Sequence, residues 1–155
     1  MELYRALQNV AWRMEAISPT HTAERRGFKS AQLEALTPDT VRNRVFHVDV
    51  ESAGPAQDLT DGSIRTAGVD IIISVYYPTD SVVPDRLYRM ILPDLQDVVR
   101  TIEDPELYVG YSDAASSDDI GIMDRQVTRS PILQNEGDGY WTLQIAVQTL
   151  IKGAW

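Results

Sequence analysis

Hydrophobic side chains at the start of the chain recur at the spacing of an α-helix. One apolar stripe, with successive spacings of four, three, four and three residues, is formed by Leu3, Leu7, Val10, Met14 and Ile17. Side chains at these intervals share one face of a helix. Ser18-Pro19 follows, and the residue before a proline disfavours helical backbone. We therefore predict an amphipathic helix over residues 2–17 with one face packed on a core.

Further along the chain the hydrophobic period changes to two. Phe46, Val48 and Val50 alternate with polar residues, which predicts a strand with one buried face. A polar stretch with turn signals, residues 52–66, separates it from a second strand predicted over residues 69–77. We expect the two strands to form an antiparallel hairpin with a tip of roughly 14 residues, and loops of that length often carry function.

A second helical pattern begins at Pro84 and ends at Asp104-Pro105. Its apolar positions keep the helical spacing and comprise Leu87, Ile91, Leu95, Val98 and Ile102. Pro93 lies inside this pattern. Because proline has no backbone N–H and clashes with the preceding turn, we expect Pro93 either to kink the helix or to begin a second one.

The end of the chain is rich in strand signals. Residues 125–134 and 140–152 flank the turn-forming sequence Glu136-Gly137-Asp138-Gly139, which predicts a second hairpin. In its last strand, apolar residues alternate with a polar set, Thr142, Gln144 and Gln148. A short apolar segment at residues 107–111 is a further strand candidate. Residues 112–124, rich in Ser, Asp, Ala and Gly, are expected to form a mobile acidic loop.

The order helix, hairpin, helix, hairpin predicts an α+β fold. We expect a single domain spanning residues 1–155, in which two hairpins build a mostly antiparallel or mixed β-sheet and two main helices pack on one face. Residues 18–42 contain breaker residues at both ends and short helical potential around residues 30–36, and are interpreted as a connecting arm. Residues 52–66 and 112–124 are the long loops of this arrangement.

Composition and charge narrow the possible functions. The 155 residues carry 23 acidic and 14 basic side chains, a formal net charge of −9, which disfavours a nucleic-acid binder that relies on phosphate contacts. The acidity is uneven, since residues 1–47 carry a formal net charge of +2 and residues 48–155 one of −11.

The sequence contains no cysteine, so there is no disulfide, thiolate zinc site or cysteine nucleophile. We recognise no targeting or membrane-spanning segment, so a soluble protein with no membrane partner is expected.

Two groups of polar residues invite a metal-binding interpretation. His47, Asp49 and Glu51 share the polar face of the first predicted strand and offer one imidazole and two carboxylates. Any half-buried strand produces this alternation, and the solvent-facing interpretation is preferred. Oxygen ligands for a hard cation come from a second group, Asp113, Asp118, Asp119 and Asp124. That group lacks the spacing of a calcium-binding loop, so we interpret it as a solvated loop and assign no metal.

Catalytic motifs are missing from the sequence. It contains no G-x-S-x-G elbow, phosphate-binding glycine loop, H-E-x-x-H motif or dinucleotide fingerprint. Only His21 and His47 offer an imidazole for acid–base chemistry near neutral pH, and His21 lies in the predicted arm. We therefore predict a protein that is not an enzyme, with no catalytic residue and no cofactor, and keep a small hydrolase only as a third choice of function.

Large aromatic and basic side chains outside the core stripes indicate an interface. Trp12 lies about 180° around the first helix from Leu3, and the one dense basic cluster of the sequence surrounds Phe28. Trp and Arg are enriched in interface hot spots. The suspected interface residues are Trp12, Arg25, Arg26, Phe28 and Trp155. The alternative is that the fold itself covers the aromatic ones, because large side chains often complete the margin of a core.

The whole-chain pattern resembles the tail terminator, or tail-completion, family of tailed bacteriophages. Four segments carry the resemblance: an initial amphipathic helix MELYRALQNVAWRMEAI, a hairpin RVFHVDVES…AGVDIIISVYYP, a central helix PDRLYRMILPDLQDVVRTIED and a final hairpin ending in YWTLQIAVQTLIKG. The resemblance is one of architecture and element order, without a diagnostic residue motif. Neighbouring neck and tail-tube families have similar small sheet folds and stay open as alternatives.

The resemblance implies a structural virion protein that forms a ring, typically a homohexamer, ending the tail tube and connecting it to the head or neck. Its partners would be further copies of itself, the tail tube protein and a head-completion or neck connector protein, while DNA passes through the channel without specific binding. The protein would assemble in the host cytoplasm and reside in the tail or neck of the virion. The main alternative from another class is an acidic adaptor or inhibitor module that binds a basic partner.

Overall fold

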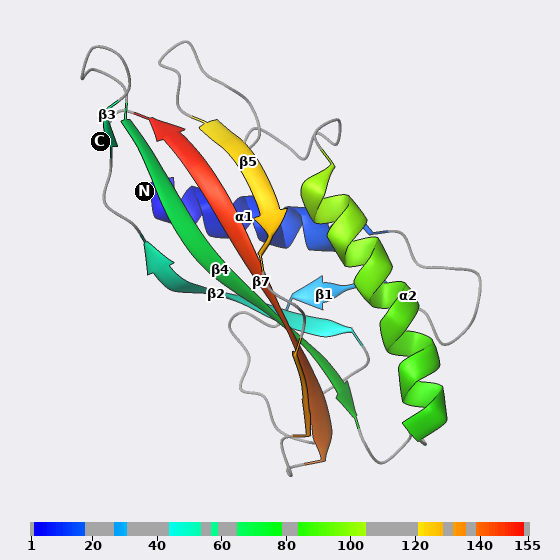
Figure 1. Cartoon of the computed structure of the whole chain (residues 1–155). Coiled ribbons are helices and arrows are strands. Elements are labelled where there is room, and N and C mark those ends of the chain that lie inside the picture. Colours follow the sequence, from blue (N-terminus) through cyan, green and yellow to red (C-terminus); the bar gives the residue numbers. More distant parts are fainter. Residues whose placement is uncertain are drawn as a thin grey trace.

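The computed structural model describes residues 2–17, 27–30, 44–53, 57–58, 65–78, 84–104, 121–128, 132–135 and 139–153. These residues form two helices and seven strands, in the order α1 (Glu2–Glu15), β1 (Lys29–Ser30), β2 (Val45–Ala53), β3 (Gln57–Asp58), β4 (Arg65–Pro78), α2 (Pro84–Glu103), β5 (Gly121–Val127), β6 (Ile132–Asn135) and β7 (Tyr140–Gly153) (Figure 1). The fold is α+β, as the sequence pattern predicts.

The β-sheet is built around two long strands. β4 and β7 run antiparallel and pair without interruption from Arg65 with Gly153 to Pro78 with Tyr140. β2 pairs with β4 as the predicted first hairpin, and β3 extends the pairing along the same edge of β4. β5 and β6 both pair with the edge of β7 that faces away from β4. β1 runs parallel to β2 at one end of the order β1-β2-β4-β7-β5, so the sheet is mixed.

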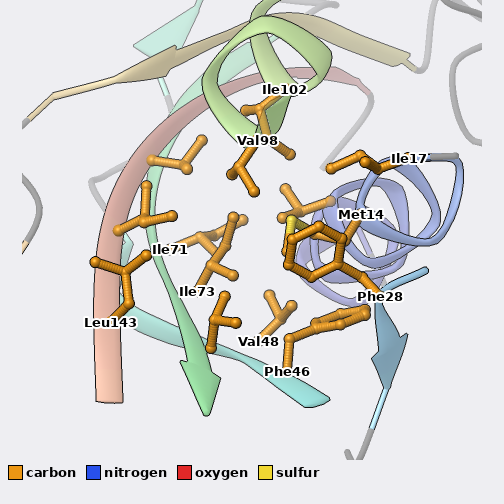
Figure 2. Close-up of a cluster of buried hydrophobic side chains, with 14 of the residues drawn as sticks. Met14, Ile17, Phe28, Phe46, Val48, Ile71, Ile73, Val98, Ile102 and Leu143 are labelled. Carbon is orange, nitrogen blue, oxygen red and sulfur yellow. The ribbon is translucent and has the colours of Figure 1, made fainter. Parts of the chain in front are cut away.

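Both helices pack on the same face of this sheet. In β4 the odd-numbered residues from Val69 to Tyr77 are buried and the even-numbered ones are partly exposed, as the alternation of side chains along a strand requires. Figure 2 shows side chains of both helices, among them Met14 and Ile102, gathered with Ile73 of β4 in one buried cluster. The core therefore lies between the two helices and one face of the sheet.

α2 continues through Pro93 as one helix of 20 residues, so the expectation that this proline begins a second helix is wrong. Proline inside a helix costs roughly 3 kcal/mol. Buried apolar side chains lie on both sides of it, including Ile91 and Val98, and each contributes about 1.5–3 kcal/mol. The apolar stripe outweighs the lost backbone hydrogen bond and keeps both halves of the helix on one core.

Short strands lie in segments where we expected an arm or loops. In the predicted arm, β1 pairs with β2, and the N–H of Lys29 donates to the C=O of Arg44 over 3.1 Å. In the predicted loop 52–66, β3 pairs with β4 and shortens the hairpin tip. In the predicted acidic loop 112–124, the last four residues begin β5. Such short pairings depend on the backbone groups of the neighbouring strand, so the hydrophobic period contains no signal for them.

The second hairpin is shorter than predicted. β6 pairs with the first part of β7 around the predicted turn, whereas residues 125–127 belong to β5, which pairs with the second part of β7. One predicted strand is thus two strands along a single edge. Thr142, predicted on the polar face of the last strand, is buried because β7 lies inside the sheet, where Thr142 is paired with Tyr76 of β4 and with Gln134 of β6.

Some predicted features fall outside the described residues. These are the strand candidate at 107–111, the first part of the acidic loop at 112–120 and the helical potential at 31–36. Within the ranges that the structure does describe, no helix combines the length and the apolar character needed to cross a lipid bilayer.

Candidate protein interaction site

A groove opens between α1 and the strands β1 and β2. Its volume is about 240 Å³, and its lining comprises Leu7, Gln8, Ala11, Trp12, Glu15, Ser30 and Val48. Five of these residues belong to α1 at positions that share one face of a helix. The lining is mainly apolar, with polar groups contributed by Gln8, Glu15 and Ser30. We call this feature the α1 groove.

The sequence of α1 explains why the groove lies on this side of the helix. Val10 and Met14 are fully buried and attach α1 to the core. Trp12 lies two residues from each of them, about 200° around the helix, and is half-buried in the lining of the groove. Glu15 is exposed. The indole of Trp12 therefore forms part of a groove wall that solvent can reach, and the carboxylate of Glu15 lies at the same wall.

A second surface feature lies on α2. Tyr88 and Leu92 are the large hydrophobic side chains that are exposed among the described residues, at 52% and 61%. They are four residues apart and therefore adjacent on one face of the helix. Arg89, next to Tyr88, is also exposed. We call these three residues the α2 patch.

A buried polar network fixes α2 to the sheet. Asp94 accepts hydrogen bonds from Nε of Arg44, at 3.0 and 2.8 Å to its two carboxylate oxygens, and from the hydroxyl of Tyr77 at 2.9 Å. Arg44 has a φ of 65°, in the left-handed region that residues other than glycine rarely adopt. Its N–H donates to the C=O of Tyr76 over 3.2 Å. Because Asp94 is held inside, Leu92, two residues earlier, faces outward.

Two arginines bind the C-terminal end of α2. Arg13 of α1 donates from Nη1 to the C=O groups of Thr101 and Asp104, at 2.9 and 2.8 Å. Arg125 of β5 donates from Nε to the C=O of Ile102 over 3.2 Å. Cationic donors at this end of a helix satisfy its last carbonyls and interact favourably with the helix dipole. These contacts also fix the position of α1, and hence of the groove, relative to α2.

The suspected interface residues have different positions in the structure. Trp12 lines the α1 groove. Phe28 is only 6% exposed and belongs to the buried core cluster (Figure 2). The fold itself covers this ring, so Phe28 is a core residue and not an exposed anchor. Arg25, Arg26 and Trp155 lie outside the described residues.

The polar residues of β2 lie on the sheet face opposite the helices. Nε2 of His47 is 2.7 Å from a carboxylate oxygen of Asp49, and both side chains are in contact with solvent. Glu51 is exposed as well. In the described part of the chain, no group of three or more histidine, aspartate or glutamate side chains is placed to hold a metal ion. Outside that part lie the side chains of the second candidate group, Asp113, Asp118, Asp119 and Asp124.

Comparisons of the chain with protein-family models and with curated proteins found no match. A function for the protein therefore has to rest on its fold and on the α1 groove and the α2 patch.

Sequence reasoning missed the α2 patch, although the pattern contained a signal for it. Tyr88 and Leu92 are apolar, four residues apart, and lie off the stripe that includes Ile91 and Val98. Large apolar residues at helical spacing outside the core stripe indicate a second contact surface. For the α1 groove the sequence indicated only the side of Trp12, because the opposite wall includes Ser30 of β1, a strand of two residues.

Proposed function

We propose that the protein is a subunit of a ring that ends a bacteriophage tail tube and connects it to the head or neck, leaving a channel for DNA. The observation that carries the proposal is the presence of two unlike surface features, the α1 groove and the α2 patch, on one small α+β fold. The resemblance to tail terminator proteins rests on the same order of elements that this fold contains.

A ring of more than two subunits needs two different surfaces on every subunit, because a surface that binds a copy of itself closes at a dimer. The α1 groove is concave and is bounded by α1, β1 and β2. The α2 patch projects from a different helix. Exposed apolar side chains next to polar ones are typical of protein interaction sites. A concave and a projecting surface at different places on one chain favour head-to-tail assembly.

The charge of the chain supports a role in which DNA passes without being held. Proteins bind the DNA backbone through lysine and arginine, and here acidic residues outnumber basic ones by 23 to 14. In a ring of such subunits, any part of this surplus that faces the channel would repel phosphates. In this proposal DNA is therefore cargo and not a specific ligand.

The proposal also assigns partners and a location. The ring is a homo-oligomer, with six subunits in the expected arrangement, between the tail tube protein and a head-completion or neck connector protein. It forms in the host cytoplasm and then belongs to the tail or neck of the virion. Its role is mechanical: it caps the tube and presents a docking surface to the head, and it performs no chemical reaction.

Electron microscopy combined with mass measurement in solution tests this function. The purified protein is imaged alone and after mixing with tail tubes of the phage whose genome encodes it. Closed rings with a central channel, or caps at the tube ends, are the expected result. A compact monomer or dimer at all protein and salt concentrations that also leaves the tube ends bare contradicts the proposal.

The same measurements separate the ring from an acidic adaptor or inhibitor. Such a module would stay small in solution and would bind a basic protein partner with an affinity that falls steeply as salt is added. A ring subunit held partly by apolar contacts should lose less of its self-association at high salt. Salt dependence of the two kinds of complex therefore distinguishes the classes.

A further inference from the structure

We propose that the α2 patch of one copy of the protein binds in the α1 groove of a second copy. Tyr88 and Leu92 enter the groove beside Trp12, and Arg89 faces Glu15 at its rim. This inference rests on the proposed ring function and names the contact between neighbouring subunits.

The size of the groove suits side chains better than a small-molecule ligand. Pockets for such ligands typically measure about 300–1,000 Å³, whereas the α1 groove measures about 240 Å³. A cavity of about 150 Å³ admits a benzene molecule. The groove thus has room for one aromatic ring with an aliphatic side chain next to it, which is the pair that the α2 patch presents.

The two surfaces also match in chemical character. Leu7, Ala11 and Val48 give the groove an apolar lining, while Tyr88 and Leu92 expose half or more of their surface to water. Moving that apolar surface out of water is favourable. Tryptophan and tyrosine are also among the residues most enriched in interface hot spots, so contact between Trp12 and Tyr88 would contribute much of the affinity.

A single chain does not fill its own groove with its own patch. α2 contacts α1 through its C-terminal end, where Arg13 donates to the C=O of Thr101. Leu92 lies nine residues before Thr101, and a rise of 1.5 Å per residue puts them about 14 Å apart along a rigid helix. The patch of one chain therefore does not reach the groove of the same chain, whereas a second copy can bring its patch to this groove.

Charge favours the same occupant. Glu15 is exposed at the groove, and Arg89 is exposed next to Tyr88 on the patch. Opposite charges at the rim of a contact steer encounter and fix its register. A second copy therefore supplies both the apolar side chains and the complementary charge.

Because the contact joins unlike surfaces, every pair of subunits still offers one groove and one patch to further copies. Contacts of this kind propagate until a ring closes. When a variant with a damaged groove is mixed with a variant with a damaged patch, one intact groove–patch contact can form between them. The remaining groove and patch of that pair are both damaged, so assembly should end at the dimer. A contact between identical surfaces would not show this behaviour.

Trp12→Ala damages the groove and leaves the patch intact, whereas Leu92→Asp damages the patch and leaves the groove intact. Gln126→Asp is the matched control, since it makes the same change of charge at an exposed position on β5. Circular dichroism and unfolding midpoints establish that each variant folds. If Trp12→Ala does not fold, Glu15→Arg replaces it, because Glu15 is exposed.

Analytical ultracentrifugation then measures the mass of each protein and of the mixture. The wild type and Gln126→Asp should form species larger than a dimer. Trp12→Ala alone and Leu92→Asp alone should each need about 30-fold more protein to associate, the effect of removing a hot-spot side chain. The mixture of Trp12→Ala and Leu92→Asp should form a one-to-one dimer and nothing larger.

Charge reversal adds an independent readout. Glu15→Arg and Arg89→Glu should each weaken association, and the double variant should recover it. Normal association of the contact variants, a mixture without a one-to-one dimer, or a wild type that stays monomeric at every concentration overturns the proposed contact. If the contact variants associate normally, or if their mixture gives no one-to-one dimer, but the wild type still forms rings, the ring function stands and a different contact holds the ring. The same conclusion follows whenever the wild type caps the ends of tail tubes. The absence of both rings and caps removes the function itself.

Discussion

Arg44 and Asp94 form an ion pair in the interior of the protein. Nε of Arg44 lies 3.0 and 2.8 Å from the two carboxylate oxygens of Asp94, and both side chains are only 1% exposed. The two residues are 50 positions apart, one immediately before β2 and the other in the middle of α2. The pair therefore joins the sheet to the helix that presents the α2 patch.

Replacing Arg44 by methionine is expected to destabilise the protein by about 3–5 kcal/mol, because it leaves the carboxylate of Asp94 buried without its charged partner. Methionine is similar in length and does not relieve the positive φ at this position. Urea unfolding followed by circular dichroism measures the change in the free energy of unfolding.

The matched control is Arg100→Met in the same helix, where Arg100 is 79% exposed and pairs with Asp97 at 2.9 Å. An exposed pair contributes about 0–1 kcal/mol, so this control should stay near the wild type. A double variant, Arg44→Met with Asp94→Leu, should recover part of the lost stability, since replacing both partners of a buried pair costs less than removing one. Equal effects at Arg44 and Arg100 would contradict the assigned burial.

Tyr77→Phe removes one hydrogen bond from the same network. The hydroxyl of Tyr77 donates to the carboxylate of Asp94 over 2.9 Å, and the residue is fully buried. Hydrogen bonds to charged groups contribute about 1.5–3 kcal/mol, and a loss of that size is expected in urea unfolding. Tyr88→Phe, which removes the same hydroxyl from a half-exposed residue on α2, should cost less than about 0.5 kcal/mol. A neutral Tyr77→Phe would show that the hydroxyl adds nothing to the network.

Much of the fold could be predicted from the hydrophobic period because apolar side chains fix which face of each long element is buried. The stripe that contains Val10 and Met14 packs on the core, and the alternation of Phe46 and Val48 with polar residues marks the first strand of the hairpin. The same reasoning failed where pairing involves only a few residues. β1 has two residues, too few to show any period.

The candidate site was predicted only in part. The position of Trp12 opposite the core stripe indicated a contact surface, and it lines the α1 groove. Arg44 and Asp94 were missed because a local pattern cannot show which residues far apart in sequence meet. Asp94 does carry a signal, since it is an acidic residue between Ile91 and Val98 at the spacing of the buried stripe. A charge at such a position requires a buried partner.

Ile73→Ala tests which face of β4 carries the core. Ile73 is fully buried and is paired with Ile145 in β7. Truncating a buried isoleucine to alanine costs about 2–5 kcal/mol. The matched control is Ile72→Ala, because Ile72 is the neighbouring residue on the opposite, half-buried face. Ile72→Ala should lose clearly less stability in urea unfolding than Ile73→Ala. A larger loss for Ile72→Ala would mean that the helices cover the face of the sheet opposite to the one described.

Arg13→Met tests whether a guanidinium from α1 caps α2. The substitution removes the donors that reach the partly buried C=O groups of Thr101 and Asp104, and each carbonyl left without a partner costs up to about 1–3 kcal/mol. Hydrogen exchange should accelerate more in the last turn of α2 than in β4, because the lost contacts are local to that turn. Arg100→Met on the same helix should leave exchange unchanged. If Arg13→Met accelerates exchange equally in both elements, the cap has no local role, and Arg13 stabilises only the fold as a whole.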